Sequence, residues 1–257
     1  MKYVSSRIES FNLKRKEGTD VNSFFDADDS VPAMIRGILF DLDGTLLDRE
    51  RSLRAFLHDQ YARMPDMHTL PRHVFTERFV ALDQHGYVWK DVVYGRLIEE
   101  TGWKLSAEQL LEDYISGFGR HCIGFPNLIP MLDKLRSLNL RLGIVSNGFT
   151  NVQRANIEGL GIVDYWDEIL ISEAEGLRKP DPALFGRALE RLGLHPGEAA
   201  FVGDHPANDI EASVRVGIVG LWKRNDVYDP PTCPHMAIED LRQVAAWAES
   251  EQAGSFL

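Results

Sequence analysis

Hydrophobic residues between positions 49 and 120 recur at steps of three and four, which is the spacing of one face of an α-helix. Four such groups follow one another, and Ser106, just before the last group, suits the N-cap of a helix. The pattern therefore predicts that residues 49–120 are helical. The four groups are Leu53, Phe56, Leu57, Tyr61 and Met64; Phe75, Phe79 and Leu82; Trp89, Val92, Val93 and Leu97; and Leu111, Tyr114, Ile115 and Phe118.

The chain on either side of this stretch contains short apolar runs of strand length. Ile35–Phe40 is mostly apolar and ends just before Asp41, which is typical of a buried parallel strand followed by a loop. From residue 128 onward, helix and strand patterns alternate, and Asp181 followed by Pro182 is a good helix start. The predicted helices are 128–138, one from Thr150, Pro182–Leu192 and 207–216, and the predicted strands are Arg141–Ser146, Glu168–Ile171, Ala199–Gly203 and Ile218–Trp222.

This order of elements predicts an α/β fold, an open parallel sheet of Rossmann-like type with helices on both faces. The helical stretch interrupts the sheet after its first strand. We therefore expect an α/β core domain made of residues 34–48 and 121–257, and an inserted, mainly helical domain made of residues 49–120. Residues 1–33 are polar, mixed in charge and without an apolar period, which predicts a loosely ordered N-terminal extension.

The composition is that of a globular protein, with 44% hydrophobic and 26% charged residues. The net charge of −11 repels phosphate backbones, so we expect no nucleic-acid partner, and a phosphorylated substrate would need local positive charge. No apolar run approaches the roughly 18 residues of a spanning helix, so we expect no membrane partner. Cys122 and Cys233 have neither disulfide nor zinc-site spacing, and residues 1–18 lack a secretory pattern, which favours the cytoplasm.

Polar side chains gather at the predicted strand ends, where open parallel sheets bind their ligands. Each group by itself has the composition of an ordinary turn, but their joint occurrence places four carboxylates and a lysine at one edge of the sheet. Carboxylates clustered in this way are costly without a cation, so the set implies a hard divalent metal ion. The groups are Asp41-Leu42-Asp43-Gly44-Thr45, Ser146-Asn147-Gly148, Arg178-Lys179-Pro180 and Gly203-Asp204 with Asn208-Asp209.

These ordered motifs resemble those of the haloacid dehalogenase-like superfamily, which consists mostly of magnesium-dependent phosphohydrolases. The resemblance extends from about residue 35 to residue 222, and the inserted helices resemble that family's cap domain. The resemblance implies a phosphatase that hydrolyses a small phosphorylated metabolite, such as phosphoglycolate, a sugar phosphate or a nucleoside monophosphate. The expected reaction passes through an aspartyl-phosphate intermediate. We expect the protein to be a monomer or a homodimer.

The resemblance also assigns roles to residues of this chain. Asp41 is the expected nucleophile, and Asp43 is the expected acid that protonates the leaving group and later deprotonates the water. Mg²⁺ would bind the Asp41 carboxylate, the Asp43 backbone carbonyl and Asp204, while Asp209 would hold the metal's waters or Lys179. The phosphate oxygens would be bound by Leu42, Ser146, Asn147 and Lys179.

Other activities remain open on this fold. A phosphomutase shares every motif, and a scaffold or phosphate-sensing protein could use the fold without catalysis, although such proteins usually lack a motif carboxylate and none is missing here. A 2-haloacid dehalogenase would use Asp41 without a metal, but that branch lacks the carboxylate that this chain has as Asp43. A phosphonate-cleaving enzyme would need a cap lysine to form an imine. The two candidates, Lys90 and Lys104, show no sequence sign of being desolvated.

Overall fold

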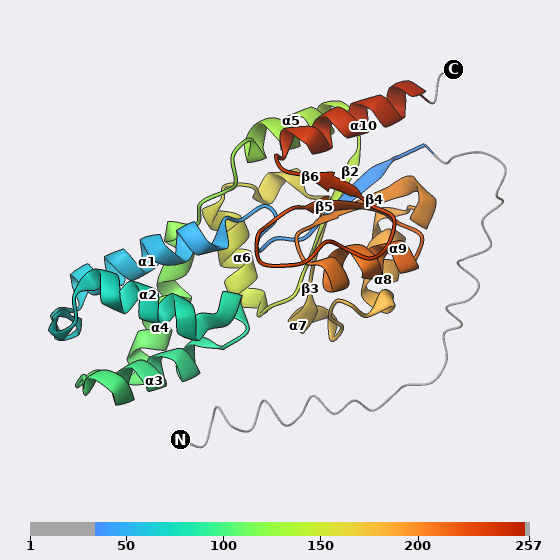
Figure 1. Ribbon diagram of the computed structural model, residues 1–257. Helices are drawn as coiled ribbons and strands as arrows, with labels where there is room; N and C mark the ends of the chain where they lie inside the picture. The colour runs from blue at the N-terminus through green and yellow to red at the C-terminus, as the bar shows by residue number, and fades with distance from the viewer. Residues whose placement is uncertain (1–33, 255–257) are drawn as a thin grey trace. The chain divides into compact units, whose positions relative to one another are not determined.

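The computed structural model describes residues 34–254, and they form a six-stranded sheet in the order β3-β2-β1-β4-β5-β6. Every neighbouring pair of strands is parallel, which confirms the predicted α/β fold (Figure 1). The strands are β1 (Gly37–Phe40), β2 (Arg141–Ser146), β3 (Glu168–Ile171), β4 (Ala199–Gly203), β5 (Val219–Lys223) and β6 (Met236–Ile238).

The first strand occupies the middle of the sheet, between β2 and β4. Phe40, the last residue of β1, is in register with Ile144 of β2 and with Val202 of β4. The chain therefore leaves β1, β2 and β4 at the same edge of the sheet. The strands that flank β1 on its two sides, β2 and β4, both come later in the sequence. Such a switch in strand order is where open α/β sheets form a ligand crevice.

Two layers of helices cover the sheet, and successive residues of β1 face opposite layers. Ile38 and Phe40 belong to the hydrophobic cluster that includes α5 and α10, whereas Leu39 belongs to the cluster that includes α8 and α9. Figure 1 shows α5 and α10 side by side on one face of the sheet and α8 and α9 on the other. The helices of the core are α5 (Leu128–Ser137), α6 (Thr150–Gly159), α7 (Ser172–Glu175), α8 (Pro182–Leu192), α9 (Ala212–Arg215) and α10 (Arg242–Gly254).

Residues 49–120, between β1 and α5, contain four α-helices joined by short turns, as predicted. Ser106 caps the fourth helix, because its hydroxyl accepts a hydrogen bond from the Gln109 amide at 3.1 Å and the Gln109 side chain returns one to the Ser106 amide. Aromatic rings pack between these helices, with the centroids of Phe56 and Tyr114 5.3 Å apart. The helices are α1 (Arg49–Arg63), α2 (Arg72–Asp83), α3 (Lys90–Thr101) and α4 (Ala107–Gly117).

The structure corrects several predicted boundaries. The strand predicted at 35–40 begins at Gly37, and the one predicted at 218–222 spans Val219–Lys223. The helix predicted at 207–216 begins one residue earlier, with Pro206 at the start of a π-helical turn over Pro206–Glu211 that continues into α9. Proline suits the first helical position, because its ring fixes the backbone angle that a helix needs.

The hydrophobic face predicted for the third inserted helix, from Trp89 to Leu97, was partly wrong. Trp89 precedes α3 as its N-cap, and Val92 is 44% exposed. The buried face of α3 is formed by Val93, Tyr94 and Leu97, and the Tyr94 hydroxyl donates a hydrogen bond to the buried Gln60 side chain at 2.9 Å. Tyr94 can therefore occupy a core position that the spacing rule gave to a valine.

Some predictions concern parts of the chain outside this description. The predicted N-terminal extension, residues 1–33, lies outside the described residues. Within residues 34–254, no helix is long and apolar enough to cross a membrane. Both cysteines, Cys122 and Cys233, are free.

Candidate active site

Lys179 connects two of the predicted site carboxylates in a buried position. It comes from the loop between α7 and α8, and its Nζ lies 2.6 Å from Asp41 Oδ1 and 2.7 Å from Asp209 Oδ1. The lysine side chain is only 2% exposed. The other oxygen of Asp41 accepts a hydrogen bond from the Thr45 hydroxyl at 3.3 Å. The Asp41 carboxylate is therefore held from both sides, directly after the strand that presents it.

Asn147 fixes the loop that carries Lys179. Its side-chain oxygen accepts a hydrogen bond from the Lys179 amide at 2.9 Å, and its side-chain nitrogen donates to the Lys179 carbonyl at 3.0 Å. Both ends of the Asn147 carboxamide are thus engaged with the backbone of the lysine. The Asn147 side chain, which was expected to bind phosphate, therefore holds the backbone of Lys179 in place. Only the backbone amide of Asn147 remains as a donor for a phosphate oxygen.

Gln153, on the first turns of α6, was missed by the sequence reasoning. Its amide nitrogen lies 2.5 Å from Asp43 Oδ2, 2.9 Å from the Ser146 hydroxyl and 3.2 Å from the Asn147 carbonyl. Asn156 fixes the orientation of the amide by donating to Gln153 Oε1 at 2.8 Å. The available signal was a polar residue six positions after Asn147, in the first turn of the predicted helix, but its contact with Asp43 depends on the fold.

The carboxylates Asp41, Asp204 and Asp209 form a compact cluster whose ligand oxygens lie within 4.8 Å of one another. Gly44 makes room for it, because a Cβ at this position would lie 2.3 Å from Asp204 Oδ2, and its φ of +84° also favours glycine. Gly203 does the same for Asp209, whose Cβ would lie 2.4 Å from an added methyl group. The two glycines allow acidic side chains to approach the ends of β1 and β4 closely.

Backbone contacts anchor the acidic loop that follows β4. The Trp222 indole nitrogen and the Asn225 amide both donate to the Asp204 carbonyl, at 2.9 and 3.0 Å. Asp209 Oδ2 accepts a hydrogen bond from the His205 amide at 3.0 Å. His205 in turn caps the following π-helical turn, because its Nδ1 accepts from the Asn208 amide at 3.1 Å. The histidine therefore has a structural partner within this loop.

The electrostatics of the cluster show an excess of negative charge. Burial raises the pKa of Asp41 to about 6, although the Lys179 ammonium lowers it. Burial also raises the pKa of Asp204 well above its ordinary value, and the charge of Asp41 adds to this effect. For Lys179, burial lowers the pKa, but the carboxylates of Asp209 and Asp41 outweigh burial and leave it raised. One ammonium thus serves several buried carboxylates.

A second buried charge cluster lies in the inserted helices. Asp83, at the end of α2, accepts hydrogen bonds from two nitrogens of Arg49 at 2.9 and 3.1 Å and forms an ion pair with Lys90 at 2.5 Å. The side chains of Asp83 and Lys90 are 1% and 2% exposed. The expectation that neither cap lysine is desolvated was therefore wrong for Lys90. The partners are separated in sequence, so spacing alone did not reveal the ion pair, whereas Lys104 is exposed.

A cavity of about 590 Å³ lies between the acidic cluster and Arg49, the one residue of the second cluster that lines it. It is lined by Asp41, Asp43, Lys179, Asp204 and Asp209 from the core and by residues of the inserted helices and the turn after α2. Of the other predicted phosphate-binding residues, Asn147 lines the cavity, whereas Ser146 and Leu42 do not. Both of these are buried, and the Ser146 hydroxyl accepts a hydrogen bond from Gln153. The insertion and its approaches contribute Asp48, Arg49, Glu50, His85, Gly86 and Tyr87.

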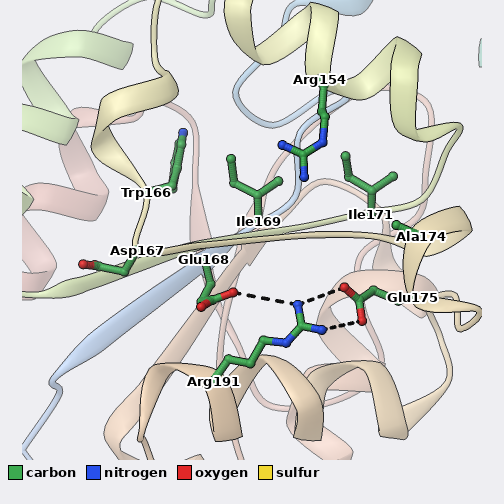
Figure 2. A pocket seen from close by; sticks show the side chains of 9 residues that line it. All are labelled: Arg154, Trp166, Asp167, Glu168, Ile169, Ile171, Ala174, Glu175 and Arg191. Atoms are coloured by element: carbon green, nitrogen blue, oxygen red, sulfur yellow. Dashed lines mark hydrogen bonds and ion pairs between the residues drawn. The ribbon is translucent and has the colours of Figure 1, made fainter.

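A separate hollow of about 360 Å³ lies along the edge strand β3 (Figure 2). Three of its charged side chains pair with one another, because Arg191 contacts Glu175 at 2.9 Å and Glu168 at 3.8 Å. None of the predicted site residues lines it. The cavity at the carboxyl ends of β1, β2 and β4 is therefore the candidate active site.

Comparison with known proteins identifies the family of this chain. The sequence profile of haloacid dehalogenase-like hydrolases matches residues 38–222, which span β1 to β5. A glyceraldehyde 3-phosphate phosphatase from Methanopyrus kandleri is 29% identical over 206 residues, covering 76% of this chain and 86% of the relative. A phosphoserine phosphatase from Thermus thermophilus is 31% identical over 159 residues, covering 61% of this chain and 64% of the relative.

Solved structures show the same fold. A phosphatase from Thermococcus onnurineus has a TM-score of 0.60 and 28% identity, covering 83% of this chain and 97% of that one. A 2-haloacid dehalogenase from Pseudomonas syringae has a TM-score of 0.57 and 27% identity, covering 84% and 99%. Because the family profile covers most of the sheet and all four motifs, this chain belongs to the haloacid dehalogenase-like hydrolases.

Proposed function

We propose that this protein is a magnesium-dependent phosphatase that hydrolyses a small phosphorylated metabolite through an aspartyl-phosphate intermediate. The observation that carries the proposal is the meeting of Asp41, Lys179 and Asp204 in one cavity, with Asp43 two residues after the nucleophile. This arrangement supplies a nucleophile, a cation for the phosphoryl oxygens and an acid for the leaving group, which are the groups that phosphoryl transfer needs.

Asp41 is the proposed nucleophile. A carboxylate needs no general base before it attacks phosphorus, and its position is held by Lys179 at 2.6 Å and by the Thr45 hydroxyl. The ammonium of Lys179 would also bind the phosphoryl oxygens, where it offsets charge in the ground state and in the transition state. Asp209 keeps this ammonium in place from its other side.

Asp43 is the proposed general acid, and later the base that deprotonates the hydrolytic water. Its carboxylate accepts the hydrogen bond from Gln153, which leaves one oxygen for the leaving group. Burial raises the pKa of Asp43, although Arg49 and the Gln153 hydrogen bond lower it, and a raised pKa suits a proton donor. The Ser146 hydroxyl and the backbone amides of Leu42 and Asn147 would hold the phosphate oxygens.

The acidic cluster fits a magnesium ion. Its donors are hard carboxylate oxygens within 4.8 Å of one another, and glycine at position 44 leaves open the space beside Asp204. Asp41, Asp204 and the Asp43 carbonyl would hold the ion, while Asp209 is engaged with Lys179. When bound, the metal supplies the positive charge that lets a phosphate dianion approach these carboxylates.

We further infer that residues 49–120 form a cap domain over a core of residues 34–48 and 121–257. Tyr87, from the turn before α3, lines the cavity together with the core loops, and its hydroxyl lies 3.3 Å from that of Tyr228. Trp89 packs against Phe149 of the core, with 4.6 Å between ring centroids. Cap residues at the cavity are in a position to select the organic part of the substrate.

The names of the relatives favour phosphate esters of small molecules, since two of them act on phosphoserine and glyceraldehyde 3-phosphate. A phosphomutase remains the nearest alternative, because it differs only in the acceptor of the phosphoryl group. The structural likeness to 2-haloacid dehalogenases raises that activity as a second candidate. Asp43 argues against it, because displacement of halide at carbon needs no acid at this position.

The proposal is tested by Asp41→Asn, measured as phosphate release from a panel of phosphorylated metabolites. The amide cannot act as a carboxylate nucleophile, so we expect turnover to fall by about a thousandfold or more. The fold should survive, because Lys179 keeps its ion pair with Asp209 at 2.7 Å. The melting temperature provides the control, and wild-type turnover in the pure variant would remove Asp41 from the mechanism.

A further inference from the structure

The cap cluster of Arg49, Asp83 and Lys90 carries more positive than negative charge. Two cations share one carboxylate, so the cluster has a net charge of +1 in a chain whose total is −11. An uncompensated buried charge is costly, and structures retain one where it has a partner or a ligand. One of the two cations of this cluster therefore has no carboxylate of its own within the cluster.

Lys90 is the cation that balances Asp83. Its Nζ lies 2.5 Å from Asp83 Oδ1, both side chains are almost fully buried, and the ammonium also lies 5.4 Å from the centre of the Tyr114 ring. These contacts leave the ammonium inaccessible to a ligand. The surplus charge is accordingly that of Arg49, whose side chain is 17% exposed.

Arg49 faces the candidate active site. It lines the cavity together with Asp41 and Asp43. Burial raises the pKa of the Asp43 carboxyl, and the Arg49 guanidinium is the charge that lowers this pKa most. In the proposed mechanism, Asp43 protonates the ester oxygen, so the leaving group lies beside Asp43 and on the side of Arg49. The acidic residues next to Arg49 in the sequence have cations of their own, with Asp48 3.7 Å from Arg51 and Glu50 3.0 Å from Arg54, whereas no ion pair involves Asp43 within residues 34–254. Asp43 is protonated when it acts as the acid, and Arg49 then has only Asp83 as a counter-charge, which it shares with Lys90.

We propose that Arg49 binds a second anionic group on the substrate, so that the preferred substrates are phosphate monoesters whose alcohol part carries a carboxylate or a second phosphate. Asp83 holds the guanidinium by two nitrogens, which fixes its plane and leaves its remaining donors for the ligand. The inference rests on the proposed function, because it assumes that the cavity holds a phosphate ester.

The test compares matched pairs of esters. We expect the wild-type enzyme to have a higher kcat/KM for 2-phosphoglycolate than for ethyl phosphate, or for propane-1,3-diol bisphosphate than for propyl phosphate. The pair with the larger preference identifies the anion. Arg49→Gln should lower that preference by about tenfold or more, because a charged hydrogen-bond partner is lost. This variant should fold, since the Asp83–Lys90 ion pair remains neutral.

Two further variants separate recognition of the anion from protein stability. Arg51→Gln removes the same charge from an exposed position on the same helix, and it should leave the ratio of kcat/KM values within each pair of esters unchanged. Arg49→Lys keeps the buried charge but not the fork of nitrogens, so we expect a wild-type melting temperature with a reduced preference. Restoration of the full preference by lysine would contradict recognition by the guanidinium.

The outcomes are distinguishable from failure of the proposed function. If the wild-type enzyme releases phosphate from no ester of the metabolite panel, the proposed function fails and this inference fails with it. If it hydrolyses other esters of the panel but neither member of any pair, the proposed function stands and the anion site is overturned. Two results overturn the anion site alone and leave phosphatase activity standing. In the first, the wild-type enzyme hydrolyses ethyl or propyl phosphate at least as well as the ester that carries the second anion. In the second, Arg49→Gln slows both esters of a pair equally.

Discussion

Gln153 illustrates how one buried side chain arranges several reactive groups. Its amide nitrogen reaches Asp43, Ser146 and a backbone carbonyl, while Asn156 determines which way the amide faces. The thiol of Cys122 extends this chain by donating to Asn156 Oδ1 at 3.6 Å. The general acid of the proposed mechanism is therefore oriented by a helix of the core and not by its own loop.

We predict that Gln153→Leu affects esters according to their leaving groups. Without its hydrogen bond, Asp43 is no longer held toward the ester oxygen, so kcat for an alkyl phosphate should fall by about tenfold to a hundredfold. For p-nitrophenyl phosphate the loss should be much smaller, because nitrophenolate leaves without a proton. The exposed neighbour Arg154→Gln is the control. Equal losses on both esters would show that Gln153 acts on the phosphoryl group or on stability.

For single residues, the sequence predicts a place in the site where the residue stands in a short motif at the end of a strand. Asp41, Asp43, Lys179 and Asp204 stand in short motifs at strand ends, and the structure brings them to one cavity. Gln153 contacts a carboxylate 110 positions away, and the partners of Asp83 are set by helix packing. Such contacts leave no local spacing to detect, so they emerge only from the fold.

Among the elements, the first three helices of the insertion are joined by charge as well as by apolar packing. Arg49 begins α1, Asp83 ends α2 and Lys90 begins α3, so these three side chains connect the ends of three helices. Burial raises the pKa of Asp83, but Arg49 and Lys90 outweigh burial and leave it lowered. The carboxylate is thus stabilised in its charged form by both partners.

We predict that Asp83→Asn is the most destabilising single change in this cluster. It leaves two buried cations without a counter-charge, so the free energy of unfolding should fall by about 3 to 5 kcal/mol. Lys90→Met should cost less, because Arg49 and Asp83 then form a neutral pair. Chemical denaturation of the two variants checks the order, and a smaller loss for Asp83→Asn than for Lys90→Met would contradict it.

Element prediction succeeded where the period was clear and the element was long or fully buried. The bounds of β2, β3, β4 and α8 were predicted correctly, because apolar runs and the Asp181-Pro182 cap mark them. No element was predicted after residue 222, although β6 and α10 complete the sheet and its cover. β6 has only three residues and two of them are exposed, so it leaves no apolar period to recognise.

For the molecule as a whole, the site follows from the order of the strands. Because β1 lies between β2 and β4, motifs that are more than 100 residues apart come to one edge of the sheet. The parallel alternation of elements predicted this edge from sequence, but not which residues of the inserted helices line the cavity there. That information depends on how α1, α2 and α3 pack against one another and on the turn at Gly86 and Tyr87.

The most direct test of this account is the metal dependence of phosphate release from p-nitrophenyl phosphate. The carboxylates of Asp41, Asp204 and Asp209 lie within 4.8 Å of one another, and the Lys179 ammonium forms ion pairs with two of them, so a phosphate dianion needs a further cation to bind beside this cluster. We expect activity to disappear in EDTA, to return with Mg²⁺ and to be inhibited by Ca²⁺, which accepts more ligands at longer distances and changes the position of Asp41. Full activity after exhaustive chelation would contradict the account and favour a metal-free reaction at Asp41.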